Sequence, residues 1–198
     1  MTRKRLTPAE RKEEILNISL RLFSEKGYKN TTMRDLVNAT GLSAGGLYHH
    51  YKSTVEILYD LMLQGCVYRE NIITESLNGL AKPFSTRALA KIIVDKALAS
   101  NPFIPVYVMF LQSMQEDEQL LHLYQKLKDR SIRYFTQILT DYGGSTFSEE
   151  TWTFISDFIN TLIIGCETLG VRDDFASKRL LLEKVIVDVL EENRKEID

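Results

Sequence analysis

The fold of this chain is decided by the stretch Thr31-Thr-Met-Arg-Asp-Leu-Val-Asn-Ala-Thr-Gly-Leu-Ser-Ala-Gly-Gly-Leu-Tyr-His-His-Tyr-Lys52. Thr32 and Asp35 have the spacing of a capping box, which predicts the start of a helix. Gly41 supplies a residue that can adopt the left-handed conformation and end that helix. Ser43 can cap a second helix directly afterwards. We therefore expect two short helices joined by a glycine turn.

The two faces of the second expected helix differ in character. Leu47 and Tyr51 lie four residues apart and share one face. The opposite face carries small, polar and aromatic groups, namely Ala44, Gly45, Tyr48 and His49. A helix that buries Leu and presents Tyr, His and bare backbone is suited to lie against nucleic acid. This is the arrangement of a helix-turn-helix.

The composition is that of an ordinary globular protein of one or two domains, with 198 residues of which 44% are hydrophobic and 26% charged. Charge is unevenly distributed along the sequence. Residues 1–55 carry ten Lys and Arg against five Asp and Glu, a net charge of +5, whereas the remainder carries fifteen against twenty-two, a net charge of −7. The basic N-terminal quarter is a candidate phosphate-binding surface, although a merely solvated end would have the same composition.

Nearly every segment has the helical period, and no sustained stretch alternates as a strand would. We therefore expect an all-α fold of about nine helices. The first should begin at Thr7-Pro-Ala-Glu10 and end at Gly27, and Ser53-Thr-Val-Glu56 should open a long fourth helix. Further helices are expected at about residues 85–100, 103–114, 117–142, 148–170 and 175–194.

The sequence gives little support to an enzyme, a cofactor or a metal site. No Ser/His/Asp set, glycine-rich phosphate loop or metal-spaced cluster is present, and His49 and His50 point about 100° apart on a helix. No apolar run reaches the roughly 18–20 residues of a membrane span. Cys66 and Cys166 sit in apolar helical patterns, which suits a reducing cytoplasm. A redox-sensing role for these cysteines remains an open alternative.

The first fifty residues resemble the tetracycline-repressor (TetR/AcrR) family of one-component regulators. The matching positions are Phe23, Gly27, Thr31, Thr32, Gly41, Leu42, Ser43, Gly45, Leu47, Tyr48, His50, Tyr51, Lys52 and Ser53. Downstream, only the helix count and the length agree with the family. The resemblance implies a DNA-binding domain of residues 1–53, with its motif at about 32–51, and an effector-binding and dimerisation domain of residues 54–198.

The resemblance also implies a bacterial cytoplasmic homodimer that reads a palindromic operator in double-stranded DNA, with half-sites about 34–36 Å apart. We expect a transcriptional repressor released from DNA by a small molecule. The alternative is an effector-independent DNA-bound structural or division-associated protein on the same scaffold.

Ten residues are the candidate DNA contacts: Thr32, Arg34, Ser43, Ala44, Gly45, Gly46, Tyr48, His49, His50 and Lys52. Thr32 and Ser43 cap helices in any case, and the family turns such groups toward phosphates. Gly46 departs from the family pattern, in which a side chain such as Thr is usual. The basic arm Arg3-Lys4-Arg5 either follows the DNA backbone or minor groove or has no role.

The expected recognition helix contains no Arg or Lys, the side chains that make the commonest contacts to guanine. We therefore expect contacts to the DNA backbone and DNA shape to carry a large share of its selectivity.

The candidate effector pocket consists of Met62, Cys66, Phe103, Tyr107, Phe110, Met114, Tyr124, Trp152 and Phe158. A stripe of Met and aromatic residues is also typical of plain core. Tyr107 and Trp152 stand out, because a buried hydroxyl or indole N–H needs a partner. Since the apolar run lacks paired acidic residues, we expect an apolar or weakly polar effector.

The family resemblance assigns the dimer interface to the last two long helices. Their wide apolar faces consist of Leu162, Ile163, Cys166, Leu182, Val185, Ile186, Val189 and Leu190. Packing within one chain explains part of this apolar surface.

Overall fold

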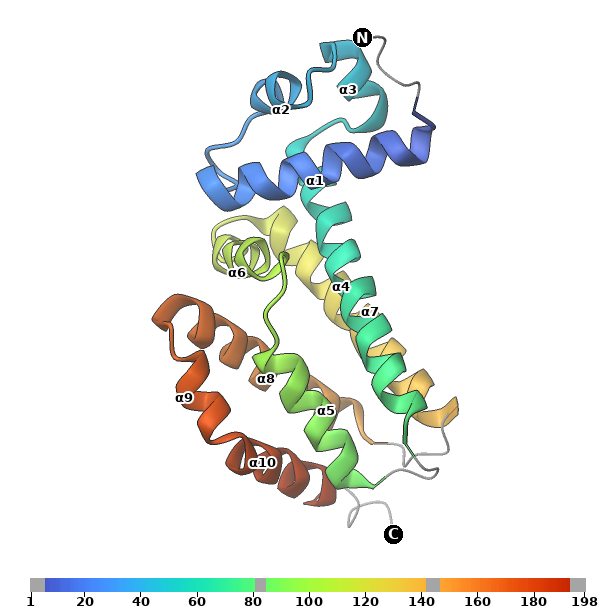
Figure 1. The fold of residues 1–198 in the computed structure, drawn as a ribbon, viewed down its shortest axis with the longest axis vertical. Coiled ribbons are helices and arrows are strands. Elements are labelled where there is room, and N and C mark those ends of the chain that lie inside the picture. Colours follow the sequence, from blue (N-terminus) through green and yellow to red (C-terminus); the bar gives the residue numbers. More distant parts are fainter. Residues whose placement is uncertain (1–5, 81–84, 142–146, 193–198) are drawn as a thin grey trace. The chain divides into compact units, whose positions relative to one another are not determined.

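A computed structural model describes residues 6–80, 85–141 and 147–192, which form ten α-helices and no strand (Figure 1). The predicted all-α class is confirmed. The basic arm Arg3-Lys4-Arg5 lies outside the described residues. The helices are α1 (Pro8–Lys26), α2 (Met33–Thr40), α3 (Ala44–His50), α4 (Thr54–Asn78), α5 (Thr86–Leu98), α6 (Ile104–Ser113), α7 (Glu118–Asp141), α8 (Glu149–Leu169), α9 (Arg172–Ser177) and α10 (Arg179–Glu192).

Local capping determines where most of these helices begin and end. Thr7 and Glu10 form the predicted capping box of α1, with the Glu10 N–H donating to Thr7 Oγ1 over 3.2 Å. Ser148 caps α8 by accepting from the Thr151 N–H over 3.2 Å. Gly170 then ends α8 at a φ of 69°. These contacts lie within four residues of each terminus, which is why the sequence could predict them.

The chain divides into two compact units, Met1–Gly65 with Pro105–Leu123, and Cys66–Ile104 with Tyr124–Asp198. They do not coincide with the predicted division after residue 53, which stays a prediction about function. We call them the first and the second unit.

The first unit has its own apolar core. α1 packs against α2, and α2 against α3. Residues fully shielded from solvent come from all of these helices and from the start of α4 and from α6: Ile15, Leu36, Leu47, Ile57, Leu58, Leu61, Val106 and Phe110. The helices that carry the expected motif therefore share one core with α6, a helix far along the chain.

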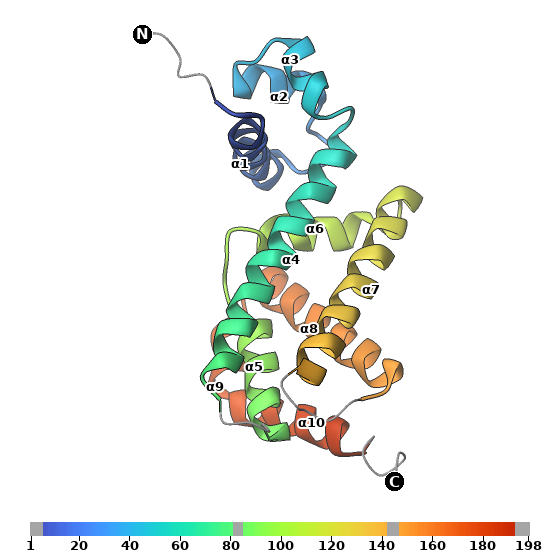
Figure 2. The same ribbon diagram turned by 90° about the vertical axis from the view of Figure 1, so that its right-hand side faces the viewer.

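In the second unit, α5 packs against α8 and α10 (Figure 2). α5 is buried along most of its length, and α10 contributes Ile186 and Leu190, which are fully shielded. Within the described ranges, no helix is long and apolar enough to cross a membrane.

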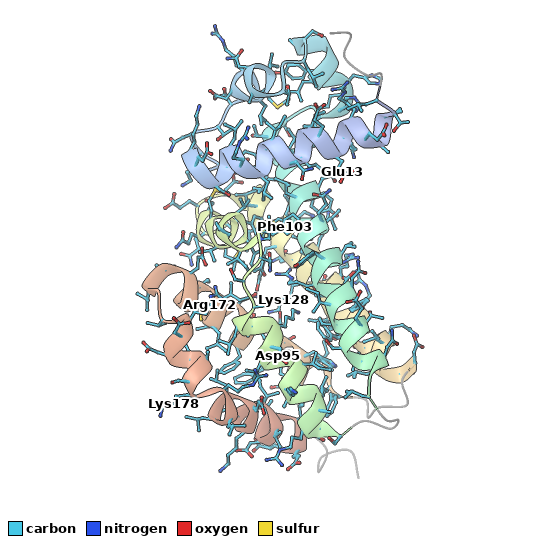
Figure 3. The ribbon with its side chains drawn as sticks, viewed as in Figure 1. Glu13, Asp95, Phe103, Lys128, Arg172 and Lys178 are labelled. Carbon is cyan, nitrogen blue, oxygen red and sulfur yellow. The ribbon has the colours of Figure 1, made fainter. Side chains whose placement is uncertain are left out.

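The end of the chain differs from the prediction of one helix over residues 175–194. It forms two helices, with Lys178, labelled in Figure 3, in a non-helical conformation between them. Arg172 donates to the carbonyls of Leu98 (2.7 Å) and Ala99 (3.0 Å). Arg179 pairs with the Asp95 carboxylate. These contacts fix both helices to α5, and since their partners are distant in sequence, local pattern could not predict the break.

Candidate nucleic-acid interface

The start of α2 is fixed by a reciprocal set of hydrogen bonds. The Asp35 N–H donates to Thr32 Oγ1 (3.2 Å), and Asp35 Oδ2 accepts from the Thr32 N–H (2.9 Å). The Thr32 hydroxyl also donates to Asp35 (2.5 Å), and Lys26 pairs with the other carboxylate oxygen at 3.2 Å. The hydrogen bonds from Thr32 and the nearby ammonium of Lys26 lower the pKa of Asp35 to about 2. The predicted capping box is confirmed.

The turn between α2 and α3 follows the predicted pattern. Gly41 has a φ of 63° and a ψ of 20°, a left-handed conformation that glycine adopts without strain. Ser43 caps α3, accepting from the Gly46 N–H over 3.1 Å. α3 therefore starts three residues after Gly41, with the exposed Ser43 at its beginning.

The two faces of α3 are as predicted. Leu47 is fully buried and Tyr51 is 2% exposed, whereas Tyr48 is 43% exposed. The other exposed positions of α3 and its cap are Ser43, Ala44, Gly45 and His49. α3 thus presents one aromatic ring, one imidazole and bare backbone to the surroundings.

The two glycines of α3 differ in the space around them. A Cβ added at Gly45 would meet nothing within 4 Å. A Cβ added at Gly46 would lie 3.2 Å from Ser43 Oγ, tighter than ordinary van der Waals contact. Packing within the chain therefore gives no reason for glycine at 45, while at 46 a side chain would press on the helix cap.

A network that the sequence did not reveal anchors the end of α3. The Tyr51 hydroxyl donates to Asp60 Oδ2 on α4 over 3.0 Å, and Lys12 Nζ of α1 lies 2.7 Å from the same oxygen. The Lys12 ammonium also lies 5.0 Å from the centroid of the Tyr51 ring. Burial, followed by the bond to Asp60, raises the pKa of Tyr51. Since Lys12 and Asp60 are 48 residues apart, spacing gave no signal for this network.

The cations near α3 lie at its edges. Lys52 is exposed, and its ammonium donates to the Tyr48 carbonyl over 2.6 Å, where it complements the negative end of the helix. The Lys52 N–H donates to Glu56 Oε2 (2.6 Å), and the Glu56 N–H to Ser53 Oγ (3.3 Å). The predicted Ser53 cap of α4 is therefore present. The Glu56 carboxylate accepts from the main-chain N–H of Lys52, one residue before the cap. Arg34 is exposed on α2.

The two adjacent histidines form an edge-to-face pair, with ring centroids 5.3 Å apart at an angle of 78°. Burial lowers the pKa of His50, and the charges of His49, Arg11 and Lys12 lower it further. Across the described ranges, no group of three or more His, Cys, Asp or Glu side chains could hold a metal ion.

The loop after α1 is held by residues around α6 within the first unit. The Tyr28 N–H donates to Met109 Sδ over 2.9 Å, and the Tyr28 ring packs edge-on against Phe23 with centroids 5.7 Å apart. Lys29 pairs with Glu116 just beyond α6. These contacts brace the loop that leads into α2, and they were not predictable from local pattern because their partners lie more than 80 residues along the chain.

The predicted pocket residues divide between the two units. Met62, Tyr107, Phe110 and Met114 belong to the first, where the rings of Tyr107 and Phe110 stack at 6.4 Å. Cys66, Phe103, Tyr124, Trp152 and Phe158 belong to the second.

In the second unit, the predicted pocket residues have different partners. The Trp152 ring stacks on Phe135 with centroids 5.6 Å apart, and its buried indole N–H has no partner among the described residues. The Tyr124 hydroxyl accepts from Asn160 over 3.2 Å, and the Phe158 ring stacks on Phe154 at 6.4 Å. Their assignment to an effector site stays a prediction.

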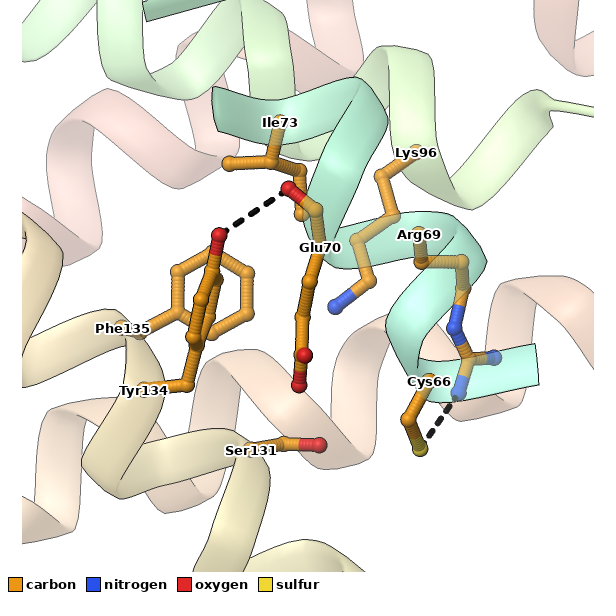
Figure 4. Close-up of a pocket in the computed structure, with 8 residues that line it drawn as sticks. All are labelled: Cys66, Arg69, Glu70, Ile73, Lys96, Ser131, Tyr134 and Phe135. Atoms are coloured by element: carbon orange, nitrogen blue, oxygen red, sulfur yellow. Dashed lines mark hydrogen bonds between the residues drawn. The ribbon is translucent and has the colours of Figure 1, made fainter. Parts of the chain in front are cut away.

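One of these residues, Cys66, lines a small pocket inside the second unit, with a cavity volume of about 10 Å³ (Figure 4). The pocket is formed by α4, α5 and α7, and its lining residues are Cys66, Arg69, Glu70, Ile73, Lys96, Ser131, Tyr134 and Phe135. The sequence singled out only Cys66 among them, because charged residues on amphipathic helices are usually solvated.

The predicted dimer residues are mostly buried within the single chain. This holds for Leu162, Ile163, Cys166, Leu182, Ile186 and Leu190, while Val189 is half-buried and Val185 is 36% exposed. The most exposed large apolar side chains of α8 and α10 and of the segment between them are instead Phe154, Leu169, Leu180 and Leu181.

Comparison with known proteins gives consistent matches. Residues 15–61 match the sequence model of the bacterial regulatory proteins of the tetR family. The transcriptional repressor KstR2 of Rhodococcus jostii is 30% identical over 119 residues, covering 57% of this chain and 56% of that protein. The chain therefore matches only about half the length of that relative. IcaR of Staphylococcus epidermidis, a negative transcriptional regulator of the biofilm operon icaADBC, is 27% identical over 87% of this chain and 89% of its own length.

Solved structures resemble the whole fold. GusR of Salmonella enterica superposes with a TM-score of 0.75 at 15% identity, covering 96% of this chain and 100% of that one. The fatty acid degradation regulator FadR of Bacillus halodurans does so with a TM-score of 0.67 at 13% identity, covering 93% and 97%. At these identities the likeness establishes the fold.

Proposed function

The chain belongs to the TetR family of bacterial regulatory proteins, and from this premise we propose that it is a sequence-specific DNA-binding repressor of transcription. The observation that carries the proposal is the exposed face of α3. Tyr48, His49 and the open backbone at Gly45 lie on the face opposite the buried Leu47. This is the helix that a helix-turn-helix protein inserts into the major groove.

The proposed docking combines phosphate contacts at the edges with α3 in the groove. The first N–H groups of α2 and α3 lack partners within their helices and favour anions. Arg34 is exposed in the first turn of α2, and Lys52 is exposed at the C-terminal end of α3. The Lys52 ammonium can donate to a DNA phosphate in place of the Tyr48 carbonyl, because both groups accept hydrogen bonds. This arrangement agrees with the expectation that backbone contacts and DNA shape provide much of the selectivity.

We further propose that the protein acts as a homodimer on a palindromic operator. The exposed Leu181 and Val185 lie four residues apart on α10, and Phe154 and Leu169 are exposed on α8. Exposed apolar side chains of this number favour an interface between copies. Two copies related by a two-fold axis would present their α3 helices to half-sites one turn apart.

The proposed regulation is a two-state equilibrium. A small molecule that binds better to one arrangement of the dimer shifts the population toward it and changes the affinity for the operator. α4 connects the two functions in sequence, since it carries Ser53 at its start and contributes Cys66 to the pocket.

The test compares Tyr48→Ala and Lys52→Ala with the wild type in fluorescence-anisotropy titrations on DNA sites selected from a random library. We expect each variant to bind about tenfold more weakly or worse. Lys91→Ala, which removes an exposed Lys from α5 in the second unit, is the control and should bind as the wild type does. Unchanged affinity in both Tyr48→Ala and Lys52→Ala would refute the assignment of this surface.

The small volume of the pocket beside Cys66 favours a second candidate, a DNA-bound protein that works without an effector. Ligand pockets usually enclose about 300–1,000 Å³, whereas this one has a cavity volume of about 10 Å³. Operator binding that no small molecule alters would favour this candidate.

A further inference from the structure

A cleft of about 660 Å³ lies between α7 and the start of α8, within the second unit. These two helices are drawn in gold and orange in Figure 2. The lining residues of the cleft are Asp129, Ile132, Arg133, Thr136, Gln137, Phe147, Glu149 and Trp152. Its volume falls in the range of about 300–1,000 Å³ that ligand pockets usually enclose. The cleft is therefore large enough for a small organic molecule, unlike the pocket beside Cys66.

Helical spacing builds the two walls of the cleft. Its α7 residues recur at intervals of three and four between positions 129 and 137, so they share one face of that helix. On the other wall, the Ser148 cap starts α8 so that Glu149 and Trp152 lie one turn apart. The Lys128 ammonium of α7 lies 2.7 Å from the Asp157 carboxylate of α8, and this pair holds the two helices together.

Trp152 brings a buried hydrogen-bond donor to this cleft. Its side chain is only 3% exposed, with the Phe135 ring stacked on it and the Phe147 ring edge to face at 5.7 Å and 90°. The indole N–H nevertheless has no hydrogen-bond partner in the described part of the chain. An aromatic ring is at most a weak acceptor, and a buried donor without a better one destabilises the folded state.

The uncharged polar side chains on the α7 wall already donate to neighbours in the chain. The Thr136 hydroxyl donates to the Ile132 carbonyl over 3.0 Å. The Gln137 side-chain amide donates to Asp141 Oδ1 over 2.8 Å. A ligand that enters the cleft therefore gains most from an acceptor placed against the Trp152 N–H.

The charged side chains of the cleft lie at its exposed rim. They are the carboxylates of Asp129 and Glu149 and the guanidinium of Arg133, two negative charges against one positive, a net charge of −1. This balance disfavours an anionic ligand. A cation is disfavoured at the buried end, because the indole offers a donor and no acceptor there. The half-buried Ile132 and Phe147 add apolar surface.

We propose that this cleft binds an uncharged, mainly apolar small molecule whose carbonyl oxygen accepts from the Trp152 N–H. The carbonyl satisfies the buried donor, and the apolar body covers Ile132 and Phe147. This ligand class agrees with the apolar or weakly polar effector expected from the sequence. The proposal rests on the proposed function only for the consequence that an occupied cleft changes operator affinity.

The test compares molecules of the same shape that differ in the accepting atom. We would titrate the full-length protein with 4-tert-butylcyclohexanone and acetophenone, using isothermal calorimetry. In their counterparts, 4-tert-butyl-1-methylenecyclohexane and α-methylstyrene, a CH₂ group replaces the carbonyl oxygen. A merely apolar cleft would favour these hydrocarbons, because water solvates them less well. We expect at least one ketone to bind, and to bind at least about threefold more tightly than its hydrocarbon counterpart.

Two charged molecules of similar shape test the electrostatics of the cleft. We expect 4-tert-butylcyclohexanecarboxylate and 4-tert-butylcyclohexylammonium each to bind at least about tenfold more weakly than the ketone. Trp152 is the only tryptophan of the chain, so a ligand beside it should also change the emission spectrum of the protein.

The variant Trp152→Phe removes the N–H and keeps an aromatic ring. We expect it to bind the ketone no more tightly than the hydrocarbon. Because the two molecules are compared on one variant, a change in stability alone does not produce this result. Tyr124→Phe is the matched control, since it removes a polar group from an aromatic ring of α7 that does not line the cleft. It should keep the preference of the wild type for the ketone.

The outcomes separate this proposal from the proposed function. Absence of binding by both ketones, tighter binding of the hydrocarbons or of either charged molecule, or an unchanged preference in Trp152→Phe would overturn the site. Binding of a ketone that leaves DNA affinity unchanged would support the site and contradict its role as an effector site. The DNA titrations of Tyr48→Ala and Lys52→Ala test the proposed function independently of this cleft.

Discussion

Lys96 faces the ring of Phe135 where a carboxylate would be expected. A cation–π contact of this kind stabilises by about 0.5–2 kcal/mol, whereas burial disfavours the charged form of the lysine.

Replacing this lysine by an apolar residue should therefore stabilise the protein. We expect Lys96→Met to raise the free energy of unfolding at pH 7 by about 1–2 kcal/mol, because the thioether fills the same space without a charge. Urea denaturation monitored by circular dichroism measures the change. Lys91→Met should stay within about 0.5 kcal/mol of the wild type. A clear loss of stability in Lys96→Met would mean that the lysine has a partner in the folded state.

The same residue predicts a pH dependence. Its pKa is about 7 in the folded state and about 10.4 in an unfolded chain. Between these values the unfolded state binds more protons, so the stability of the wild type should rise with pH from about 7 to 10. Below pH 7 the penalty is fully present and constant. Lys96→Met should show a flatter profile in the same denaturation series, and parallel profiles would contradict the lowered pKa.

At the scale of single residues, the sequence predicted contacts between near neighbours. The caps at Thr32 and Ser43 were predictable because their partners lie three residues away. The bond from Tyr51 to Asp60 and the environment of Lys96 were not, because each depends on which side chains other helices bring to the same place.

Among the elements, α3 is shaped by two glycines that a stable helix does not need. Each interior glycine is less favourable than alanine by about 0.5–1 kcal/mol. At Gly45 the space for a side chain is open, so packing within the chain does not explain why the less favourable glycine stands there. Close approach of the backbone to DNA supplies one.

Alanine at Gly45 should separate stability from DNA binding. We expect Gly45→Ala to raise the free energy of unfolding by about 0.5–1 kcal/mol, through helix propensity alone, and to weaken binding to the selected DNA site. Thermal unfolding and anisotropy titration measure the two effects.

Gly46→Ala is the matched control for the stability effect. Its Cβ would lie 3.2 Å from Ser43 Oγ, so it should gain less stability than Gly45→Ala or lose some. Tighter DNA binding by Gly45→Ala would exclude close backbone approach at this position.

Helix boundaries show the same division between local and distant causes. The first eight helices were predictable to within a few residues, because capping side chains and terminal glycines mark many of their ends. The break between α9 and α10 was not, because Arg172 and Arg179 reach back to α5 to fix it.

At the scale of the whole molecule, the apolar residues of α8 and α10 serve two purposes. The core of the single chain buries Leu182, Ile186 and Leu190. The sequence pattern could not distinguish such core residues from residues of a dimer surface. Leu181 and Val185 remain exposed on the other side of α10. A helix with apolar residues on two faces can pack against its own chain with one face and against a second copy with the other.

A charge on the exposed stripe should prevent dimerisation. We expect Leu181→Glu to remain folded, since 60% of this side chain is exposed in the single chain, and to elute as a monomer in size-exclusion chromatography with light scattering. A buried unpaired carboxylate at an interface costs about 3 kcal/mol or more. Ile72→Glu, at an apolar residue of α4 that is 44% exposed, is the control and should remain a dimer. A dimeric Leu181→Glu would remove α10 from the interface.

The sharing of one core between the N-terminal helices and α6 also affects the order in which the protein can fold during synthesis. The first unit ends in sequence at Gly65 and resumes at Pro105–Leu123. At ribosomal rates of about 5–20 residues per second, the segment that completes it follows roughly 3–12 s after α3 has been made. Until then a nascent chain carries its recognition helix without the apolar cover of α6, which makes that interval a natural point for chaperone binding.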